Sequence, residues 1–346
     1  MDLKLAFVGF GNVARDFARI LTERRALLAD RYAINWRATA IATARHGSIT
    51  SAEGIDLIEA SERIERGEKL SGIRDSTEKE STLDLVDSCD ADVLFETTPL
   101  NADTGEPAIT IIRRVLARSI NVVSANKGPV AFAYRELQEL ARLRGVSFRF
   151  EGTVMDGAPV FNLIERCLPA TKVKGFAGVL NSTTNLILTG MESGRSLDSS
   201  LAEAKRLGIV EANADYDLDG WDAAVKTVAL ANVLMSSDVR PQAVERRGIR
   251  EITEADVALA AQTGNVIRLV SRARVTDCGL KLSAMPERIP LASLLGSARG
   301  TTNVLMIETD LMGEIAVFEH EPGVRQTAYA LLSDFISIHQ AATGSN

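Results

Sequence analysis

The chain has 346 residues, of which 46% are hydrophobic and 25% charged, a composition typical of a globular protein of about two domains. With 39 basic and 46 acidic residues its net charge is −7, and no polybasic run occurs, so we expect no nucleic-acid partner. The sequence has no apolar run of membrane-span length and leads directly into a strand, so we expect no membrane partner and no signal peptide. Three dispersed cysteines indicate neither a disulfide framework nor a zinc site, and favour a cytoplasmic location.

The chain opens with a predicted buried strand at 3–10, followed by an amphipathic helix. Between them lies a Gly-x-Gly-x-x-Ala sequence that begins at Gly9. Its first glycine permits a tight turn, and its second lets a pyrophosphate approach the backbone amides at the start of the helix. We therefore predict that a dinucleotide binds at Gly9, Gly11, Asn12 and Val13, with a merely tight turn as the alternative.

A second predicted strand, at 37–43, ends in Thr43-Ala44-Arg45-His46. An NAD-specific enzyme usually has an aspartate or glutamate here for the ribose hydroxyls. No acid is present in this sequence, and Arg45 is well placed to pair with a 2′-phosphate. We therefore predict NADP as the cofactor. The alternatives are NAD as the cofactor and Arg45 as a solvated loop residue.

Strands and helices alternate through the rest of the first half. We predict helices at 53–70, from Thr104-Gly105-Glu106-Pro107 onward and at 132–144, a connection at 73–81, and strands at 91–96, 120–124 and 146–150. This order is typical of a Rossmann-type doubly wound parallel sheet with helices on both faces. Ligands bind outside the carboxyl ends of such strands, where the candidates are Thr97, Thr98, Pro99, Asn126 and Lys127.

A turn-rich joint at 151–159 separates this half from a second one. Beyond it we predict strands at 173–180, 266–275, 281–285, 303–309 and 314–318, and helices at 197–207, 254–262 and 325–338. Because this half is rich in strands but not βαβ-ordered, we predict an α+β domain. We assign residues 1–150 to a dinucleotide-binding domain, on which a helix at about 323–342 packs back, and residues 151–322 to a substrate-binding and catalytic domain.

The stretch 208–226 carries five acids and ends on a lysine. Its second part has a helical pattern, so Asp222 and Lys226 lie on one helical face, one turn apart. A surface loop with an ordinary intrahelical ion pair, contributing about 0.2–0.5 kcal/mol, is one interpretation. The other is a pocket in which carboxylates hold a substrate ammonium and hydroxyl while a lysine moves a proton. Asn181-Ser182-Thr183 would similarly bind a carboxylate or cap a helix.

Taken together, these segments resemble homoserine dehydrogenase in its short form, without a fused aspartokinase or a C-terminal regulatory domain. The resemblance covers essentially the whole chain and is carried by four groups of residues: 97–99 with 104–107, 124–129, 178–185, and 211–226. It implies an NAD(P)-dependent enzyme of threonine and methionine biosynthesis that interconverts L-homoserine and L-aspartate 4-semialdehyde. It also implies a homodimer formed through the second domain.

The resemblance further implies roles for individual residues. Lys226 and Lys127 would contact the reacting oxygen and handle its proton, with Asp222 as the third catalytic residue. The other substrate-binding residues would be Glu211, Asp217, Thr183 and Asn181. Gly323 would face the cofactor, and a sodium ion would bind Glu151 with the carbonyls of Val154, Asp156 and Ala158.

The sequence departs from the family pattern around the expected pocket. Asn213-Ala214 stands where the family has Asp-Pro, Ser182 replaces a glycine, and Met155 and Asp156 replace small residues in the sodium turn. These departures leave two alternatives open. One is a related NADP-dependent dehydrogenase of another small hydroxy acid or hydroxy amino acid, and the other is a non-catalytic dinucleotide-binding sensor.

Overall fold

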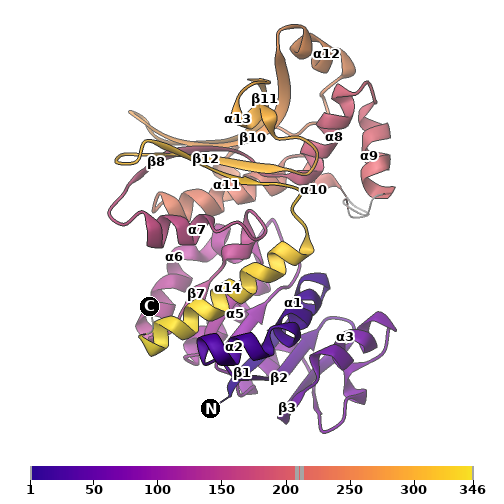
Figure 1. The fold of residues 1–346 in the computed structure, drawn as a ribbon, viewed down its shortest axis with the longest axis vertical. Coiled ribbons are helices and arrows are strands. Elements are labelled where there is room, and N and C mark those ends of the chain that lie inside the picture. The colour runs from indigo at the N-terminus through magenta and orange to yellow at the C-terminus, as the bar shows by residue number, and fades with distance from the viewer. Residues whose placement is uncertain (1, 207–209, 211–213, 345–346) are drawn as a thin grey trace. The chain divides into compact units, whose positions relative to one another are not determined.

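The computed structural model describes residues 2–206, 210 and 214–344. The chain divides into two compact units (Figure 1). Unit 1 comprises Met1–Gly157 and Gly323–Asn346, and unit 2 comprises Ala158–Pro322. Each unit has its own sheet.

Unit 1 is built on a seven-stranded sheet with the strand order β4-β3-β2-β1-β5-β6-β7. Its parallel strands are β1 (Leu3–Val8), β2 (Trp36–Thr43), β5 (Val93–Glu96), β6 (Asn121–Ser124) and β7 (Phe148–Arg149). Two further strands, β3 (Gly47–Ile55) and β4 (Thr77–Lys79), extend one edge in antiparallel fashion.

Those two edge strands correct the prediction for residues 53–81. The predicted helix at 53–70 is confined to Leu57–Glu65, and the connection at 73–81 contains β4. The physical reason is the turn at Gly47, whose φ of +91° lets the chain fold back onto β2 and bury Ile49 and Ile55. A polar, mixed sequence concealed this edge, because edge strands need few apolar residues.

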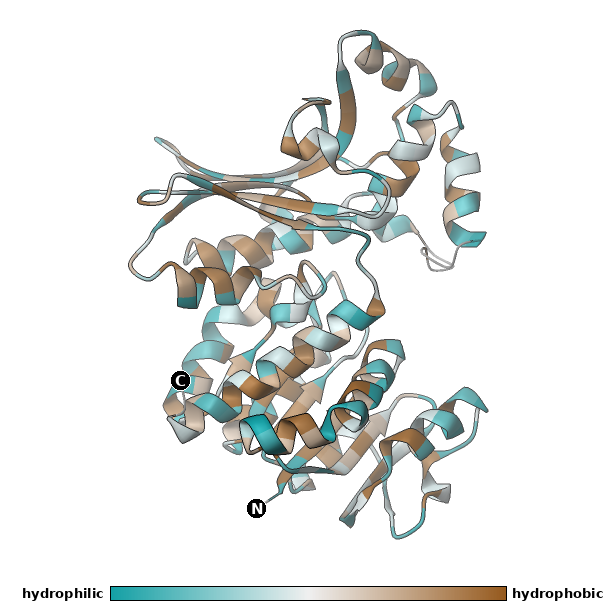
Figure 2. Cartoon of the chain, in the orientation of Figure 1, coloured by the Kyte–Doolittle hydropathy of each residue, from teal (hydrophilic) through white to brown (hydrophobic). Residues whose placement is uncertain are grey.

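Seven helices of unit 1 pack around this sheet. They are α1 (Asn12–Glu23), α2 (Arg25–Tyr32), α3 (Leu57–Glu65), α4 (Thr82–Ser88), α5 (Ala108–Ala117), α6 (Lys127–Arg144) and α14 (Val324–Thr343). Phe95 of β5 contacts Phe17 of α1 and Phe335 of α14, with ring centroids 4.6 and 5.8 Å apart, so the C-terminal helix belongs to the core of unit 1. Figure 2 shows hydrophobic residues along the strands and as stripes on these helices. The helix predicted from Thr104 onward starts later, at Ala108 directly after Pro107, so a Thr104 hydroxyl does not cap it.

Unit 2 has a six-stranded sheet with the strand order β13-β12-β8-β10-β11-β9. Its strands are β8 (Val173–Val179), β9 (Glu245–Arg246), β10 (Asn265–Thr276), β11 (Gly279–Pro290), β12 (Asn303–Thr309) and β13 (Glu314–Glu319). Its α-helices are α7 (Val160–Asn162), α8 (Ser182–Glu192), α9 (Leu197–Arg206), α10 (Asp215–Leu218), α11 (Trp221–Leu234), α12 (Glu254–Gln262) and α13 (Leu294–Ser297). The parallel sheet of unit 1 and the mainly antiparallel sheet here confirm the predicted fold class.

The two faces of the unit 2 sheet differ. Helix α11 covers the face of Ser271, whose hydroxyl donates to the carbonyl of Ala223 at 3.3 Å. The opposite face carries Arg272, and strand pairing places Ala177, Met306 and Ala316 in the same row. In the next row, Phe318 is 51% exposed. Ala177 is buried in a cluster with Leu295 and Ala298, so this second face presents apolar side chains to solvent mainly at Ala316 and Phe318 of β13.

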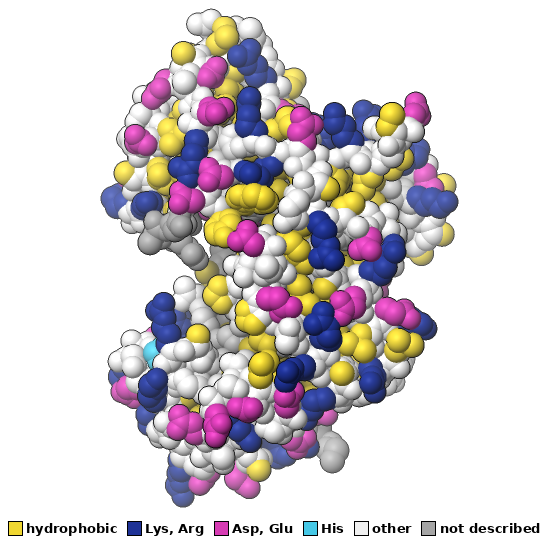
Figure 3. Space-filling view, turned by 180° about the vertical axis from the view of Figure 1, so that it is seen from behind, with side chains coloured by type: hydrophobic (Ala, Val, Ile, Leu, Met, Phe, Trp, Pro, Cys, Tyr) yellow, Lys and Arg dark blue, Asp and Glu magenta, His cyan; other side chains and the backbone are white. Residues whose placement is uncertain are grey.

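The surface in Figure 3 carries basic and acidic side chains interspersed with one another. Within the part of the chain that the structure describes, no helix has the length and apolar character needed to cross a membrane.

Candidate active site

The predicted dinucleotide loop lies at the carboxyl end of β1, in unit 1. Gly9 has a φ of +82°, and a Cβ atom there would lie 2.6 Å from the carbonyl carbon of Thr97 and 2.8 Å from the amide nitrogen of Thr98. The Thr97 hydroxyl donates to the carbonyl of Gly9 at 2.8 Å. Glycine is therefore required at position 9 by both conformation and space.

Gly11 meets a different requirement. It is the N-cap residue of α1, makes no side-chain cap, and a Cβ atom there would meet nothing within 4 Å. The amides of Asn12 and Val13 thus begin a helix beside open space. Helix N-termini of this kind accept a phosphate group. The residues present therefore fit the pyrophosphate of a dinucleotide.

Two cationic residues are brought together at the end of β2. Arg45 lies in the exposed turn between β2 and β3, and its carbonyl accepts a hydrogen bond from the Lys69 ammonium at 2.8 Å. The sequence singled out Arg45 but gave no reason to associate it with Lys69, which is 24 residues away.

The remaining cofactor candidates of unit 1 form one hydrogen-bonded group. Asn126 accepts from the amide of Gly128 at 3.0 Å and so caps α6, while its own amide donates to the carbonyl of Thr98 at 3.1 Å and reaches that of Pro99 at 3.5 Å. Because of this cap, α6 begins at Lys127 rather than at residue 132 as predicted. Beneath the group lies Glu96, a fully buried acid that the sequence analysis overlooked.

In unit 2, Asn181 joins two of the predicted acids. Its amide nitrogen donates to Asp217 Oδ1 at 2.6 Å and to Asp222 Oδ2 at 2.8 Å. Its oxygen accepts from the amide of Thr184 at 2.8 Å and caps α8. Asn181 is only 4% exposed. The helix cap is therefore present, and the amide nitrogen holds two carboxylates of the protein itself. Binding of a substrate carboxylate by this segment stays a prediction.

Lys226 extends this cluster. Its ammonium lies 3.5 Å from Asp222 Oδ2 and donates to the carbonyl of Leu180 at 2.5 Å. The Lys226 and Asp222 side chains are each 12% exposed, which differs from the solvated ion pair of the surface interpretation. The Leu180 carbonyl is a contact that the sequence could not indicate, because it is a backbone group 46 residues from Lys226.

The other residues of the acidic stretch have different surroundings. Asp215 and Asp219 both pair with Arg250, which fixes α10 and the start of α11. Glu211 lies outside the described residues. Thr183, in the first turn of α8, is 7% exposed. The stretch therefore separates into a structural pair of acids bound by Arg250 and a second pair bound by Asn181.

Of the remaining predicted ligands, Gly323 is the N-cap residue of α14. Glu151, Val154 and Asp156 lie near the end of the first segment of unit 1, and Ala158 is the first residue of unit 2. The Asp156 carboxylate accepts from the Thr327 hydroxyl at 2.8 Å. Among the described residues no three His, Cys, Asp or Glu side chains gather as metal ligands. The sodium ion, whose expected ligands are mainly carbonyls, stays a prediction.

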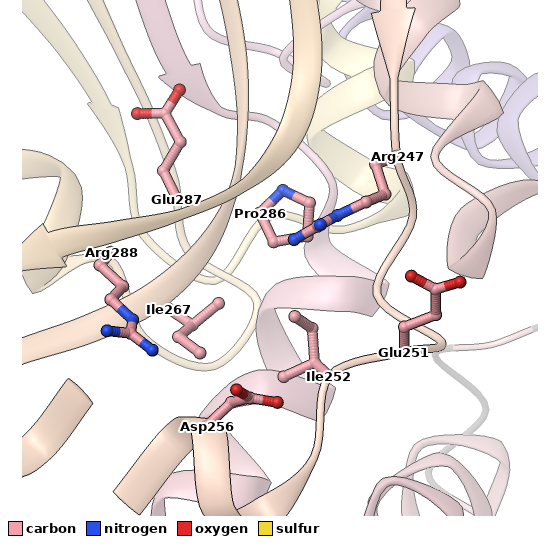
Figure 4. A pocket seen from close by; sticks show the side chains of 8 residues that line it. All are labelled: Arg247, Glu251, Ile252, Asp256, Ile267, Pro286, Glu287 and Arg288. Carbon is pink, nitrogen blue, oxygen red and sulfur yellow. The ribbon is translucent and has the colours of Figure 1, made fainter. Parts of the chain in front are cut away.

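A separate hollow of about 300 Å³ in unit 2 contains none of the predicted site residues. Its lining comprises Arg247, Glu251, Ile252, Asp256, Ile267, Pro286, Glu287 and Arg288 (Figure 4). The pKa of the Asp256 carboxyl is lowered, chiefly by hydrogen bonds from Thr253 and further by the charges of Arg288 and Arg247. These arginines therefore already face acids, and the hollow is not the candidate active site.

Known proteins resemble this chain over nearly its whole length. Residues 159–336 match the family model of homoserine dehydrogenase. The homoserine dehydrogenase of Methanocaldococcus jannaschii is 36% identical over 340 residues, which cover 98% of this chain and 99% of that protein. The chain belongs to the homoserine dehydrogenase family. The predicted family and enzyme class are thereby confirmed, and neither alternative function is favoured.

Other members of the family differ in the cofactor that their names give. The NAD(+)-dependent homoserine dehydrogenase of Pseudomonas canavaninivorans is 32% identical over 343 residues, covering 99% of this chain and 97% of that one. A hyperthermophilic archaeal homoserine dehydrogenase in complex with NADPH has a TM-score of 0.84 and 30% identity, covering 99% and 98% of the two chains. A homoserine dehydrogenase from Thiobacillus denitrificans has a TM-score of 0.85 and 26% identity, covering 99% and 74%.

Asn181→Ala should lower kcat/KM by about 10- to 100-fold, because hydrogen bonds to charged groups contribute about 1.5–3 kcal/mol. Steady-state kinetics measures this loss. The matched control is Ser182→Ala, since Ser182 directs its hydroxyl elsewhere, to the carbonyl of Thr301 at 2.9 Å. Equal kinetics for the two variants would contradict the bridging role of Asn181.

Proposed function

We propose that this protein is a homoserine dehydrogenase that reversibly oxidises L-homoserine to L-aspartate 4-semialdehyde with a nicotinamide dinucleotide. The observation that carries the proposal is the cluster in unit 2 in which buried Asn181 bridges Asp217 and Asp222, and Lys226 lies beside Asp222. Two carboxylates held this close favour a cationic ligand, because like charges repel. The ammonium group of L-homoserine is such a cation. A hydroxy acid without an amino group has no such cation, so the cluster favours the amino acid.

The chemistry divides between cofactor and protein. When bound, the nicotinamide accepts or supplies the hydride. The alcohol must also lose a proton as it is oxidised, and a lysine that touches its oxygen takes that proton. We assign this role to Lys226, whose side-chain nitrogen is oriented by the carbonyl of Leu180 and the carboxylate of Asp222. As the neutral amine it takes the alcohol proton during oxidation, and as the ammonium it returns that proton to the carbonyl oxygen during reduction. We assign the second proton-handling role to Lys127, on the strength of the resemblance. Thr183 and Glu211 complete the proposed substrate-binding set.

Lys226→Met and Lys127→Met should each lower turnover by at least about 100-fold, because each removes a group that handles the reacting proton. The assay is NADPH oxidation with aspartate semialdehyde at saturating substrate. Lys281→Met is the control, since its side chain is 70% exposed and pairs only loosely with Glu245, at 3.9 Å. Near-normal turnover in both site variants would exclude the mechanism.

We propose NADP as the preferred cofactor. Arg45 and Lys69 together support this, because a 2′-phosphate carries negative charge and favours two cations at the end of β2. NAD use by a relative keeps NAD as the alternative.

Arg45→Ala should raise KM for NADPH by about tenfold or more and leave KM for NADH unchanged, because only NADPH loses a charge-assisted hydrogen bond. Rates with the two cofactors, measured side by side in wild type and variant, test this. A wild-type enzyme that prefers NADH would keep the reaction but remove the assignment of Arg45.

We also propose a homodimer that forms through the open face of the unit 2 sheet. The support is half-buried Met306 and exposed Ala316 beside exposed Phe318, since an apolar sheet face is stabilised by a second copy. We further propose a cytoplasmic location for the protein and a sodium ion bound at Glu151. The two exposed free cysteines, Cys167 and Cys278, favour a reducing compartment.

Phe318→Arg should shift the protein from dimer to monomer, because it places a charge on the proposed contact face. Sedimentation equilibrium measures the mass. Leu259→Arg is the control, since Leu259 is similarly exposed, at 46%, but lies on α12. A wild type that is monomeric at micromolar concentration would reject the interface.

A further inference from the structure

Glu96 is a buried acid that the mechanism above does not use. It ends β5, between β1 and β6 in the middle of the parallel sheet of unit 1, and is 0% exposed. It therefore lies at the carboxyl end of the sheet, where α/β proteins bind their ligands. A fully buried carboxyl is rare unless its oxygens are hydrogen-bonded.

Both oxygens of Glu96 accept hydrogen bonds. Oε1 accepts from the Thr98 amide at 2.9 Å and from the Thr98 hydroxyl, and Oε2 accepts from the Ser124 hydroxyl at 2.7 Å. Burial raises the pKa of the Glu96 carboxyl, and these hydrogen bonds offset the effect only in part. The carboxyl thus gathers donors from the loop after β5 and from the end of β6.

The hydrogen bonds continue from Glu96 to Asn126 along two routes. The Asn126 side-chain amide donates to the Thr98 hydroxyl at 3.3 Å, and the Asn126 backbone amide donates to the Ser124 hydroxyl at 3.0 Å. The Thr98 and Ser124 hydroxyls each donate a hydrogen bond to Glu96. Asn126 in turn caps α6 at its start, beside Lys127. One carboxyl therefore anchors both routes to the start of α6.

The turn at Gly9 also depends on the position of the 97–99 loop. Thr97, directly after Glu96, donates its hydroxyl to the carbonyl of Gly9, and a Cβ atom at Gly9 would collide with the Thr97 carbonyl carbon. Any shift of the 97–99 loop would therefore move the turn that begins the dinucleotide site.

We infer that Glu96 is a positioning residue of the cofactor site, which holds the 97–99 loop and the start of α6 in register from beneath the dinucleotide. The inference rests on the proposed cofactor binding and extends it to a residue with no direct contact to the ligand. A residue that only filled the core would affect the free energy of unfolding without affecting the affinity for NADPH.

The test is the dissociation constant for NADPH, measured by fluorescence titration of the purified full-length protein without substrate. Glu96→Ala leaves the Thr98 and Ser124 donors without their acceptor and should weaken NADPH binding by tenfold or more. Glu96→Gln should stay within about threefold, because its oxygen can face Thr98 while its amide donates to the Ser124 hydroxyl, whose proton can turn to the carbonyl of Asn126 at 3.5 Å.

The matched control is Asp92→Ala, close to the opposite end of the same strand. Asp92 accepts from the backbone amide of Lys4 at 2.8 Å, so its loss should lower the melting temperature and leave NADPH binding unchanged. If Glu96→Ala fails to fold, Ser124→Ala replaces it, with an expected three- to tenfold weakening. In the double variant Glu96→Ala/Ser124→Ala the losses of NADPH affinity should be less than additive, because the Ser124 hydroxyl acts by donating to Glu96.

The outcomes separate this inference from the proposed function. Wild type that binds neither NADPH nor NADH would remove the cofactor assignment itself. The positioning role of Glu96 would be overturned by a different result. In that case the wild type binds NADPH, and the Glu96→Ala variant, or Ser124→Ala used in its place, has a dissociation constant within twofold of the wild-type value.

Discussion

The side-chain amide of Asn181 is the contact on which the candidate site depends. Three segments meet at it: the start of α8, the acidic stretch at Asp217 and the first turn of α11 at Asp222. An amide offers two donors and one acceptor in a fixed plane, so one residue can cap a helix and hold two carboxylates at once. Neither aspartate nor serine at position 181 could do both, since aspartate would add a third negative charge and serine has one donor.

The charge balance of this cluster bears on substrate choice. Asp217 and Asp222 share the Asn181 amide, and the Lys226 ammonium lies 3.5 Å from Asp222 Oδ2. Buried carboxylates are costly unless hydrogen bonds and opposite charge compensate them. A substrate ammonium would add positive charge beside these two acids, so under the proposed function the cluster is better matched to an amino acid than to a neutral alcohol. Arg250 pairs with Asp215 and Asp219, so these two acids are held by a separate cation.

The sequence predicted those parts of the molecule that depend on neighbouring residues. The Gly9–Gly11 turn, the helical spacing of Asp222 and Lys226, and the helix at 254–262 are all local, and local patterns carry them. It missed β3, the strand next to the edge strand β4, because a strand of mixed polarity has no clear period. It also missed Glu96 and the Leu180 carbonyl, since the contacts of each join segments that are distant in sequence. Burial and pairing over such separations are properties of the fold.

The departure from the family at Ser182 has a local explanation. Its hydroxyl donates to the carbonyl of Thr301, while the neighbouring Asn181 directs its amide to Asp217 and Asp222. The added hydroxyl therefore secures the 301–303 segment against the start of α8, where Asn185 also donates to the carbonyl of Thr302 at 3.0 Å. A replacement with this contact changes how the helix is held, and leaves the polar groups of the cluster in place. For this reason serine at position 182 is compatible with L-homoserine as the proposed substrate of this protein.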